Sequence, residues 1–175
     1  TETTGLGDDA EVVELAVIDC AGAVLLDTLV RPSGPVPAEA AAIHGITDAM
    51  LADAPTWSEI HARFCDLVEG RQVVIYSREY DVRVIGQTAR RYGLPAPQGF
   101  DLALDGSAVH CAMQAYAELH GEWSAEKGRY RWQKLSAAAA QQGVTVTNAH
   151  RALGDCLMTL GVVRAMASTE NAQRV

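Results

Sequence analysis

The strongest constraint on the fold is a nearly continuous apolar run at residues 11–19, which predicts a strand buried on both faces. Ala21-Gly22 supplies a turn, and residues 23–30 return as a second strand, so the two are expected to form a β-hairpin. Helical patterns then alternate with short apolar segments. This order predicts an α/β fold in which a mixed central sheet is flanked by helices on both faces.

The remaining elements follow from periodicity and helix signals. Helices are expected at 38–44, 57–69, 78–92, 112–120 and 132–142, and from Asn148 or His150 to about 166. A short buried strand is expected at 73–76, loops at 95–107 and 121–130, and a frayed tail from Ser168. No internal repeat or linker divides the chain, so residues 1–175 are interpreted as one domain.

Composition narrows the class of protein. The chain has 175 residues, 49% hydrophobic and 21% charged, which is typical of a soluble globular domain. No apolar run approaches the ~20 residues of a membrane span, and no membrane partner is expected. The four cysteines form no CxxC pair and are interpreted as reduced, buried residues, which favours a cytoplasmic location.

The net charge of −8 argues against a broad basic face for nucleic acid. One short segment differs, because cations and aromatic side chains alternate in it: Lys127, Arg129, Tyr130, Arg131, Trp132 and Lys134. It is either a phosphate contact zone or a solvated loop whose aromatic side chains fold back onto the core. Trp57, Trp123 and Trp132 are expected in the core rather than as platforms for bases.

Three scattered acidic residues, Glu2, Asp81 and Asp155, suggest a site for a hard cation. A histidine beside such a site could serve as a base for an attacking water, which is the chemistry of phosphodiester hydrolysis. Each residue also has a simpler interpretation: a polar turn for Glu2, a helix N-terminal charge for Asp81, and chance spacing for Asp155.

His150 and Asp155 are separated by about 140° if both lie on one continuous helix. Both can reach one site only if His150 lies at or before the start of that helix. Asn148 as the cap would allow this geometry.

Four stretches follow one another along the chain: TETTGL (1–6), IHGIT (43–47), YSREYD (76–81) and HRALGD (150–155). Together they resemble the DEDDh family of 3′→5′ exonucleases, and among them the proofreading epsilon subunit of bacterial DNA polymerase III and its stand-alone relatives. The resemblance implies a ribonuclease-H-like exonuclease fold. It also implies metal-dependent release of nucleoside monophosphates from the 3′ end of single-stranded DNA, with two divalent cations, Mg²⁺ or Mn²⁺.

The resemblance also assigns roles to residues. His150 would be the general base, and Glu2, Asp81 and Asp155 the metal ligands and catalytic acids. Thr3, Thr4, Gly5 and Leu6 would cradle the 3′-terminal nucleotide. His44, Gly45 and Ile46 would pack against the terminal bases, although a helix C-cap followed by a buried isoleucine explains the same three residues.

The chain departs from the family pattern in two places. Ser77 and Arg78 replace the usual asparagine and small residue, and the first motif, Asp-x-Glu, would have its Asp immediately before Thr1. We therefore expect a further N-terminal strand to precede Thr1, since loss of a central strand would exceed the ~5–15 kcal/mol that stabilises a domain. That expectation predicts Thr1 at the end of a gap in the central sheet.

Two other functions stay open. One is the same chemistry on short RNA, since no motif obviously reads a 2′-hydroxyl. The other is a non-catalytic module that binds nucleic acid or a polymerase. The expected partners are the 3′ end of a single-stranded nucleic acid and a DNA polymerase catalytic subunit.

Overall fold

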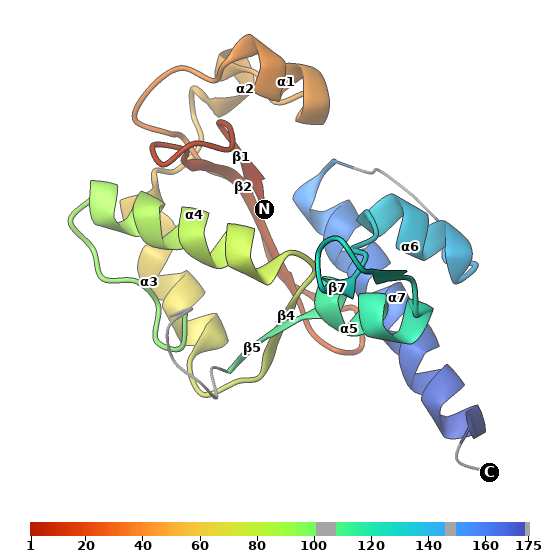
Figure 1. The fold of residues 1–175 in the computed structure, drawn as a ribbon. Helices are drawn as coiled ribbons and strands as arrows, with labels where there is room; N and C mark the ends of the chain where they lie inside the picture. Colours follow the sequence, from red (N-terminus) through yellow and green to blue (C-terminus); the bar gives the residue numbers. More distant parts are fainter. Residues whose placement is uncertain (101–107, 146–149, 174–175) are drawn as a thin grey trace.

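The computed structural model describes residues 1–100, 108–145 and 150–173, with only the backbone described for 169–173. Residues 101–107 of the expected loop and the candidate cap Asn148 lie outside the described residues. The fold is mixed α/β, which confirms the predicted class (Figure 1).

Strand β2 (Val12–Ile18) is the middle of a three-stranded antiparallel sheet, between β1 (Glu2–Thr3) and β3 (Val24–Leu29). The hairpin of β2 and β3 predicted from the turn at Ala21-Gly22 is confirmed. Val12 and Val13 point to opposite faces of the strand and are both fully buried, as expected for a strand covered on both sides.

A second sheet pairs β4 (Val73–Ile75) in parallel with β5 (Val109–Cys111). Helix α4 (Arg78–Arg91) lies in the connection between these two strands. In the described ranges no hydrogen-bonded ladder joins the two sheets, so the expected central sheet is divided into two parts. The expected strand ahead of Thr1 stays a prediction.

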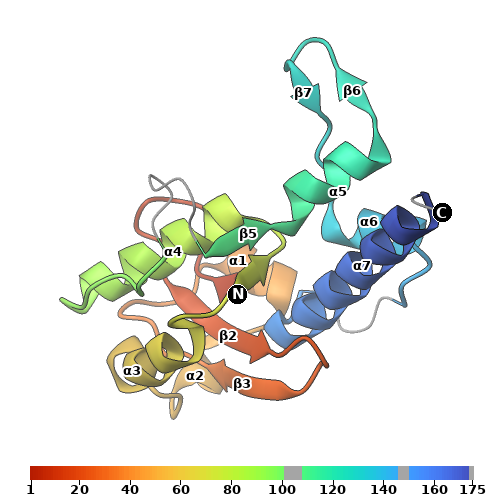
Figure 2. The ribbon, with the colours of Figure 1, turned by 90° about the horizontal axis from the view of Figure 1, so that it is seen from below.

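The helices cover both sides of β2 (Figures 1 and 2). On one side lie α3 (Trp57–Val68) and α4, and on the other α5 (Ala112–His120), α6 (Leu135–Gln141) and α7 (Ala152–Gln173). Two short helices, α1 (Ala38–His44) and α2 (Asp48–Leu51), lie beyond β1. None of the helices in the described ranges is long and apolar enough to cross a membrane.

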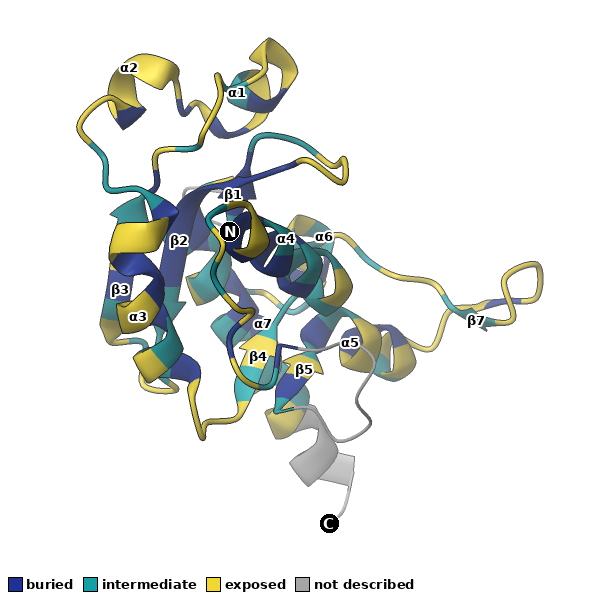
Figure 3. Ribbon diagram, turned by 90° about the vertical axis from the view of Figure 1, so that its left-hand side faces the viewer, coloured by how far each residue is buried: buried dark blue, intermediate teal, exposed yellow. Residues whose placement is uncertain are grey.

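The core has two main parts. The larger joins β2 and β3 to α3 and α4 and includes Leu15, Leu26, Phe64 and Ile85, and the smaller joins α5, α6 and α7. Figure 3 shows the buried residues concentrated along β2 and the inward faces of these helices. Helix α3 begins where predicted, because Thr56 and Glu59 form a capping box.

Several sequence predictions were wrong between residues 121 and 134. The expected loop at 121–130 contains a small hairpin of β6 (Trp123–Ser124) and β7 (Arg129–Tyr130), in which the ring of Trp123 meets Tyr130 edge-on at 5.2 Å. Helix α6 begins at Leu135 rather than at 132. Strands of two residues are too short to show an alternating pattern, so their pairing could not be read from the sequence.

The three tryptophans differ in how far they are buried. Trp57 is fully buried as predicted, whereas Trp123 is 57% exposed and Trp132 is 42% exposed, which contradicts their predicted place in the core. The frayed tail expected from Ser168 is also wrong, because helix α7 continues to Gln173. Within this helix the Ser168 hydroxyl donates to the Arg164 carbonyl.

Candidate functional site

Glu2 lies in β1, where pairing with β2 sets it opposite Glu14. The residue is only 9% exposed. The pKa of Glu2 is raised to about 7, chiefly by burial and also by the nearby carboxylates of Asp155, Glu14 and Asp81, against the opposing effect of the N-terminal ammonium. A buried carboxyl group surrounded by other carboxylates is a place where a cation would be strongly favoured.

Asp81 lies in the first turn of α4, as the sequence predicted. Its side chain is largely buried, and its Oδ1 accepts a hydrogen bond of 2.7 Å from the hydroxyl of Thr1. The N-terminal turn of a helix is a favourable place for a negatively charged side chain.

His150 precedes the helix that carries Asp155, because α7 begins at Ala152. This is the arrangement that the five-residue spacing requires. His150 has a positive φ of 63°, uncommon for a residue with a side chain, and its backbone N–H donates to Oδ1 of Asp155 at 3.3 Å. The side chain of His150 is exposed, while burial raises the pKa of Asp155, with a further contribution from Asp81.

The three acidic side chains therefore meet from three elements that are distant in the chain: β1, α4 and α7. Among the residues that the structure describes, no three His, Cys, Asp or Glu side chains are close enough to hold one ion by themselves. A Mg²⁺ ion takes one or two carboxylates and fills its other positions with water and substrate phosphate. The all-oxygen donors and their mutual repulsion fit such an ion.

An ion pair between a buried glutamate and a partly exposed arginine positions the start of α7. Glu14 in β2 accepts from Nε and Nη2 of Arg151, at 3.0 and 2.5 Å, and from the N–H of Ala152 at 2.7 Å. The link joins β2 to the residues directly after His150. Sequence reasoning missed this pair, although a glutamate inside the apolar run of β2 was a signal, since a buried charge needs a partner.

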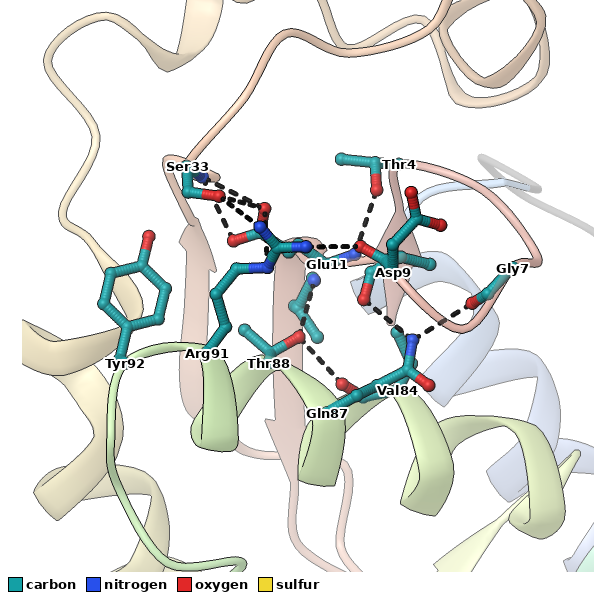
Figure 4. Close-up of polar contacts among 12 residues, drawn as sticks. Thr4, Gly7, Asp9, Glu11, Ser33, Val84, Gln87, Thr88, Arg91 and Tyr92 are labelled. Atoms are coloured by element: carbon teal, nitrogen blue, oxygen red, sulfur yellow. Dashed lines mark hydrogen bonds and ion pairs between the residues drawn. The ribbon is translucent and has the colours of Figure 1, made fainter.

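The loop between β1 and β2 is held against α4 by a polar network (Figure 4). The hydroxyl of Thr4 accepts from the N–H of Glu11 at 2.9 Å, and Gln87 donates from α4 to the carbonyls of Gly7 and Ala10. Glu11 in turn accepts from the N–H and hydroxyl of Ser33. These hydrogen bonds therefore hold the backbone of the loop in one position against α4.

Two predicted substrate residues in this loop differ in exposure. Thr3 is buried, and its hydroxyl bonds to the Gly5 carbonyl at 3.0 Å and to the hydroxyl of Tyr80. Tyr80 also donates to the Gly5 carbonyl at 2.7 Å. Leu6 is 80% exposed. The loop thus presents an apolar side chain to solvent on a backbone braced by Tyr80, which the sequence did not single out.

The segment His44-Gly45-Ile46 ends α1 and contacts β1. Gly45 adopts the left-handed conformation, with φ 73°, and its N–H bonds to the Ala41 carbonyl. His44 is buried, with Nε2 3.2 Å from the Thr3 carbonyl and Nδ1 accepting from the Ile46 N–H, which assigns the proton to Nε2. Ile46 is fully buried, so the C-cap alternative describes this geometry, and base contacts by these residues stay predictions.

The fold and the meeting of the acidic residues define a class: an α/β protein with a ribonuclease-H-like exonuclease fold. Two solved structures share it. Exonuclease X in complex with 5′ overhanging duplex DNA superposes with a TM-score of 0.68 at 26% identity, over 98% of this chain and 90% of that one. Escherichia coli exonuclease I in complex with a dT13 oligonucleotide gives 0.74 at 18% identity, over 98% of this chain and 40% of that one.

The sequence comparisons identify the family. The RNase T exonuclease family matches residues 1–163, and the chain belongs to this family. A relative named uncharacterized exonuclease CP81, from Escherichia phage 186, is 54% identical over 168 residues, 95% of this chain and 85% of the relative. A DNA polymerase III subunit epsilon-like protein of Rhodobacter capsulatus is 34% identical over 171 residues, 91% of this chain but only 22% of that protein. The chain is thus a nuclease with epsilon-like relatives.

The first prediction concerns the link between Glu14 and Arg151. Replacing Glu14 by Gln removes the ion pair and lets the start of α7 shift, and a displacement of order 1 Å can cost about 10²-fold in rate. We expect the nuclease kcat of Glu14→Gln to fall by about 10- to 100-fold with a smaller change in KM. Single-turnover rates and thermal unfolding of the same preparations measure the two effects separately.

Arg164→Lys is the matched control, because Arg164 donates to the Cys20 carbonyl at 2.7 Å and lies on the same helix, more than two helical turns beyond Asp155. It should lower stability without a comparable loss of kcat. A folded Glu14→Gln protein with the wild-type kcat would show that the link does not position the site.

Proposed function

We propose that the protein is a metal-dependent 3′→5′ exonuclease of the DEDDh type, which hydrolyses the terminal phosphodiester of single-stranded DNA and releases nucleoside monophosphates. The observation that carries the proposal is the meeting of Glu2, Asp81 and Asp155 beside His150, with each carboxylate held by a different element. The names of its relatives and structural neighbours, which include DNA-bound exonucleases, support it.

Glu2, Asp81 and Asp155 would hold two divalent cations, Mg²⁺ or Mn²⁺. When bound, the ions supply positive charge to the scissile phosphate and lower the pKa of water. The carboxylates themselves cannot attract phosphate, so their role is to fix this charge in place. His150 is the base: its exposed ring lies outside the helix and is free to accept a proton from the attacking water.

The β1–β2 loop would bind the 3′-terminal nucleotide. Thr3, Thr4 and Gly5 form its braced backbone, and Leu6 offers apolar surface to an unstacked base. His44, the last residue of α1, supports this loop through the Thr3 carbonyl. A terminal base that is unpaired reaches such a surface more readily than a paired one, because it is already unstacked. Association with a polymerase subunit and a cytoplasmic location stay predictions.

The metal requirement gives the second prediction. Activity should vanish in EDTA and return with Mg²⁺ or Mn²⁺. Asp81→Asn and Asp155→Asn should each lower kcat by more than about 10²-fold, because a neutral amide cannot balance the charge of the ion and the lost electrostatic stabilisation amounts to several kcal/mol. Asp66→Asn, an exposed aspartate on α3, is the control and should keep the wild-type rate. Full activity in chelator would refute the metal-dependent mechanism.

The third prediction concerns the base. His150→Ala should lower kcat by about 10²–10⁴-fold while the affinity for single-stranded DNA is retained, since the ring moves a proton rather than holding the strand. The matched control is His110→Ala, an exposed histidine on β5. Steady-state kinetics combined with fluorescence anisotropy in Ca²⁺ measures both quantities. An unchanged kcat would remove His150 from the mechanism.

The direction of digestion is the fourth prediction. A 5′-labelled single strand should shorten one nucleotide at a time, with the label kept on the longest product. A 3′-terminal phosphorothioate linkage should delay the first cut. An RNA strand of the same sequence tests the alternative activity, and faster digestion of that RNA would favour it. Cleavage of a circular single strand, or release of the 5′ label first, would contradict the proposal.

A further inference from the structure

The hairpin of β6 and β7 concentrates positive charge in an acidic protein. Both lysines of the chain, Lys127 and Lys134, lie in it or directly after it, together with Arg129 and Arg131. The whole chain has a net charge of −8. Figure 2 shows this hairpin projecting from α5, away from both sheets. A protein that binds a polyanion despite a net negative charge needs such a local group of cations.

The aromatic side chains of the hairpin are arranged as a surface rather than as a core. Trp123 and Trp132 are exposed, and the edge-on contact of Trp123 with Tyr130 stiffens the stem. The guanidinium of Arg129 lies 3.5 Å from the ring centroid of Trp132, which is a close cation–π contact. An exposed indole held in place by a cation is preorganised for stacking.

A cavity of about 490 Å³ lies between the segment that follows β7 and the first turns of α4 and α5. Its lining includes Trp132 after β7 and, from α4, Arg78, Tyr80 and Arg83 together with the carboxylate of Glu79. Its size is within the range of small-ligand sites, about 300–1,000 Å³. Tyr80 links this cavity to the β1–β2 loop, because its hydroxyl donates to the Gly5 carbonyl at 2.7 Å.

The cations around this cavity are not equally available. Arg83 is engaged with the β1–β2 loop through the carbonyls of Leu6 and Gly7, and Arg131 pairs with Glu122 at 3.3 Å. In the ranges that the structure describes, no ion pair joins Arg78 or Arg129 to an acidic side chain. The guanidinium groups of Arg78 and Arg129 are therefore available to bind a phosphate, whereas that of Arg131 is already paired.

We propose that this cavity is a further nucleotide subsite, which holds a nucleotide of the single DNA strand on the 5′ side of the two nucleotides that the scissile phosphate joins. Its base stacks on Trp132, and Arg78 and Arg129 contact the flanking phosphates. The subsite rests on the proposed function, and it is distinct from the terminal-base surface at Leu6. It explains why a basic, aromatic hairpin is exposed beside an acidic site.

The test is binding of 5′-fluorescein-labelled dT oligonucleotides of two and ten nucleotides, by anisotropy in Ca²⁺ without turnover. Trp132→Leu should raise Kd for the ten-mer by about 5- to 100-fold, the range that loss of one stacked base gives, and should leave Kd for the two-mer nearly unchanged. Trp132→Tyr should restore most of the affinity. Trp132→Leu binding the ten-mer as tightly as wild type would overturn the subsite.

The salt dependence separates phosphate contacts from mere loss of structure. Arg78→Gln and Arg129→Gln should each reduce the slope of log K against log salt concentration by about 0.7, the value for one phosphate contact on a single strand. Arg131→Gln is the matched control, because its cation is already paired with Glu122, and its slope should equal that of the wild type. Equal slopes for all four proteins would refute the phosphate contacts.

Binding and hydrolysis distinguish the two proposals. A wild-type protein that binds the ten-mer with these variant effects, yet does not digest it in Mg²⁺ or Mn²⁺, would support the subsite and refute the exonuclease. A protein that digests DNA but whose Trp132 and arginine variants bind normally would refute the subsite alone. Tighter binding of a blunt duplex than of the single strand would also overturn it.

Discussion

The site depends on one buried carboxylate that joins two distant parts of the chain. Glu14 is paired through the β1–β2 ladder with Glu2, and through Arg151 and Ala152 with the start of α7. Breaking a fully buried ion pair costs about 3–5 kcal/mol, but the side chain of Arg151 is 44% exposed, so the cost here lies at or below the lower end. The link matters chiefly because it fixes where β1 and α7 meet.

The acidic residues that this link brings together lower the free energy of unfolding near neutral pH. Burial raises the pKa of Glu2 from 4.5 to about 7, so the folded protein binds a proton more tightly than the unfolded chain. By linkage, this residue lowers the free energy of unfolding as pH rises through that interval. Asp155 is shifted in the same direction. A cluster that costs stability near neutral pH is typical of a functional site, and a bound cation would offset its repulsion.

The sequence predicted what local patterns determine. The apolar run of β2, the capping box at Thr56 and the first-turn position of Asp81 are each encoded within a few residues, and each was confirmed. The spacing of His150 and Asp155 even required the break that the structure has before Ala152.

The contacts that could not be predicted from the sequence are those between residues far apart in the chain. The Glu14–Arg151 pair spans 137 residues, and the brace from Tyr80 to Gly5 spans 75. Nothing in either local segment specifies such a contact. The exposure of Trp132 was missed for a related reason: an aromatic residue is assigned to the core by default, and only the folded structure shows that this side chain is 42% exposed.

The two surfaces proposed for DNA differ in the forces that they use. The loop with Leu6 is apolar and braced by neutral hydrogen bonds, so its contribution to binding should respond little to salt. The hairpin and the first turn of α4 carry unpaired cations, so theirs should weaken as salt rises. An acidic protein that kept only the first surface would repel a strand approaching its carboxylates. With the second surface beside them, the strand can be held by its backbone while its terminal phosphate is brought to the acidic site.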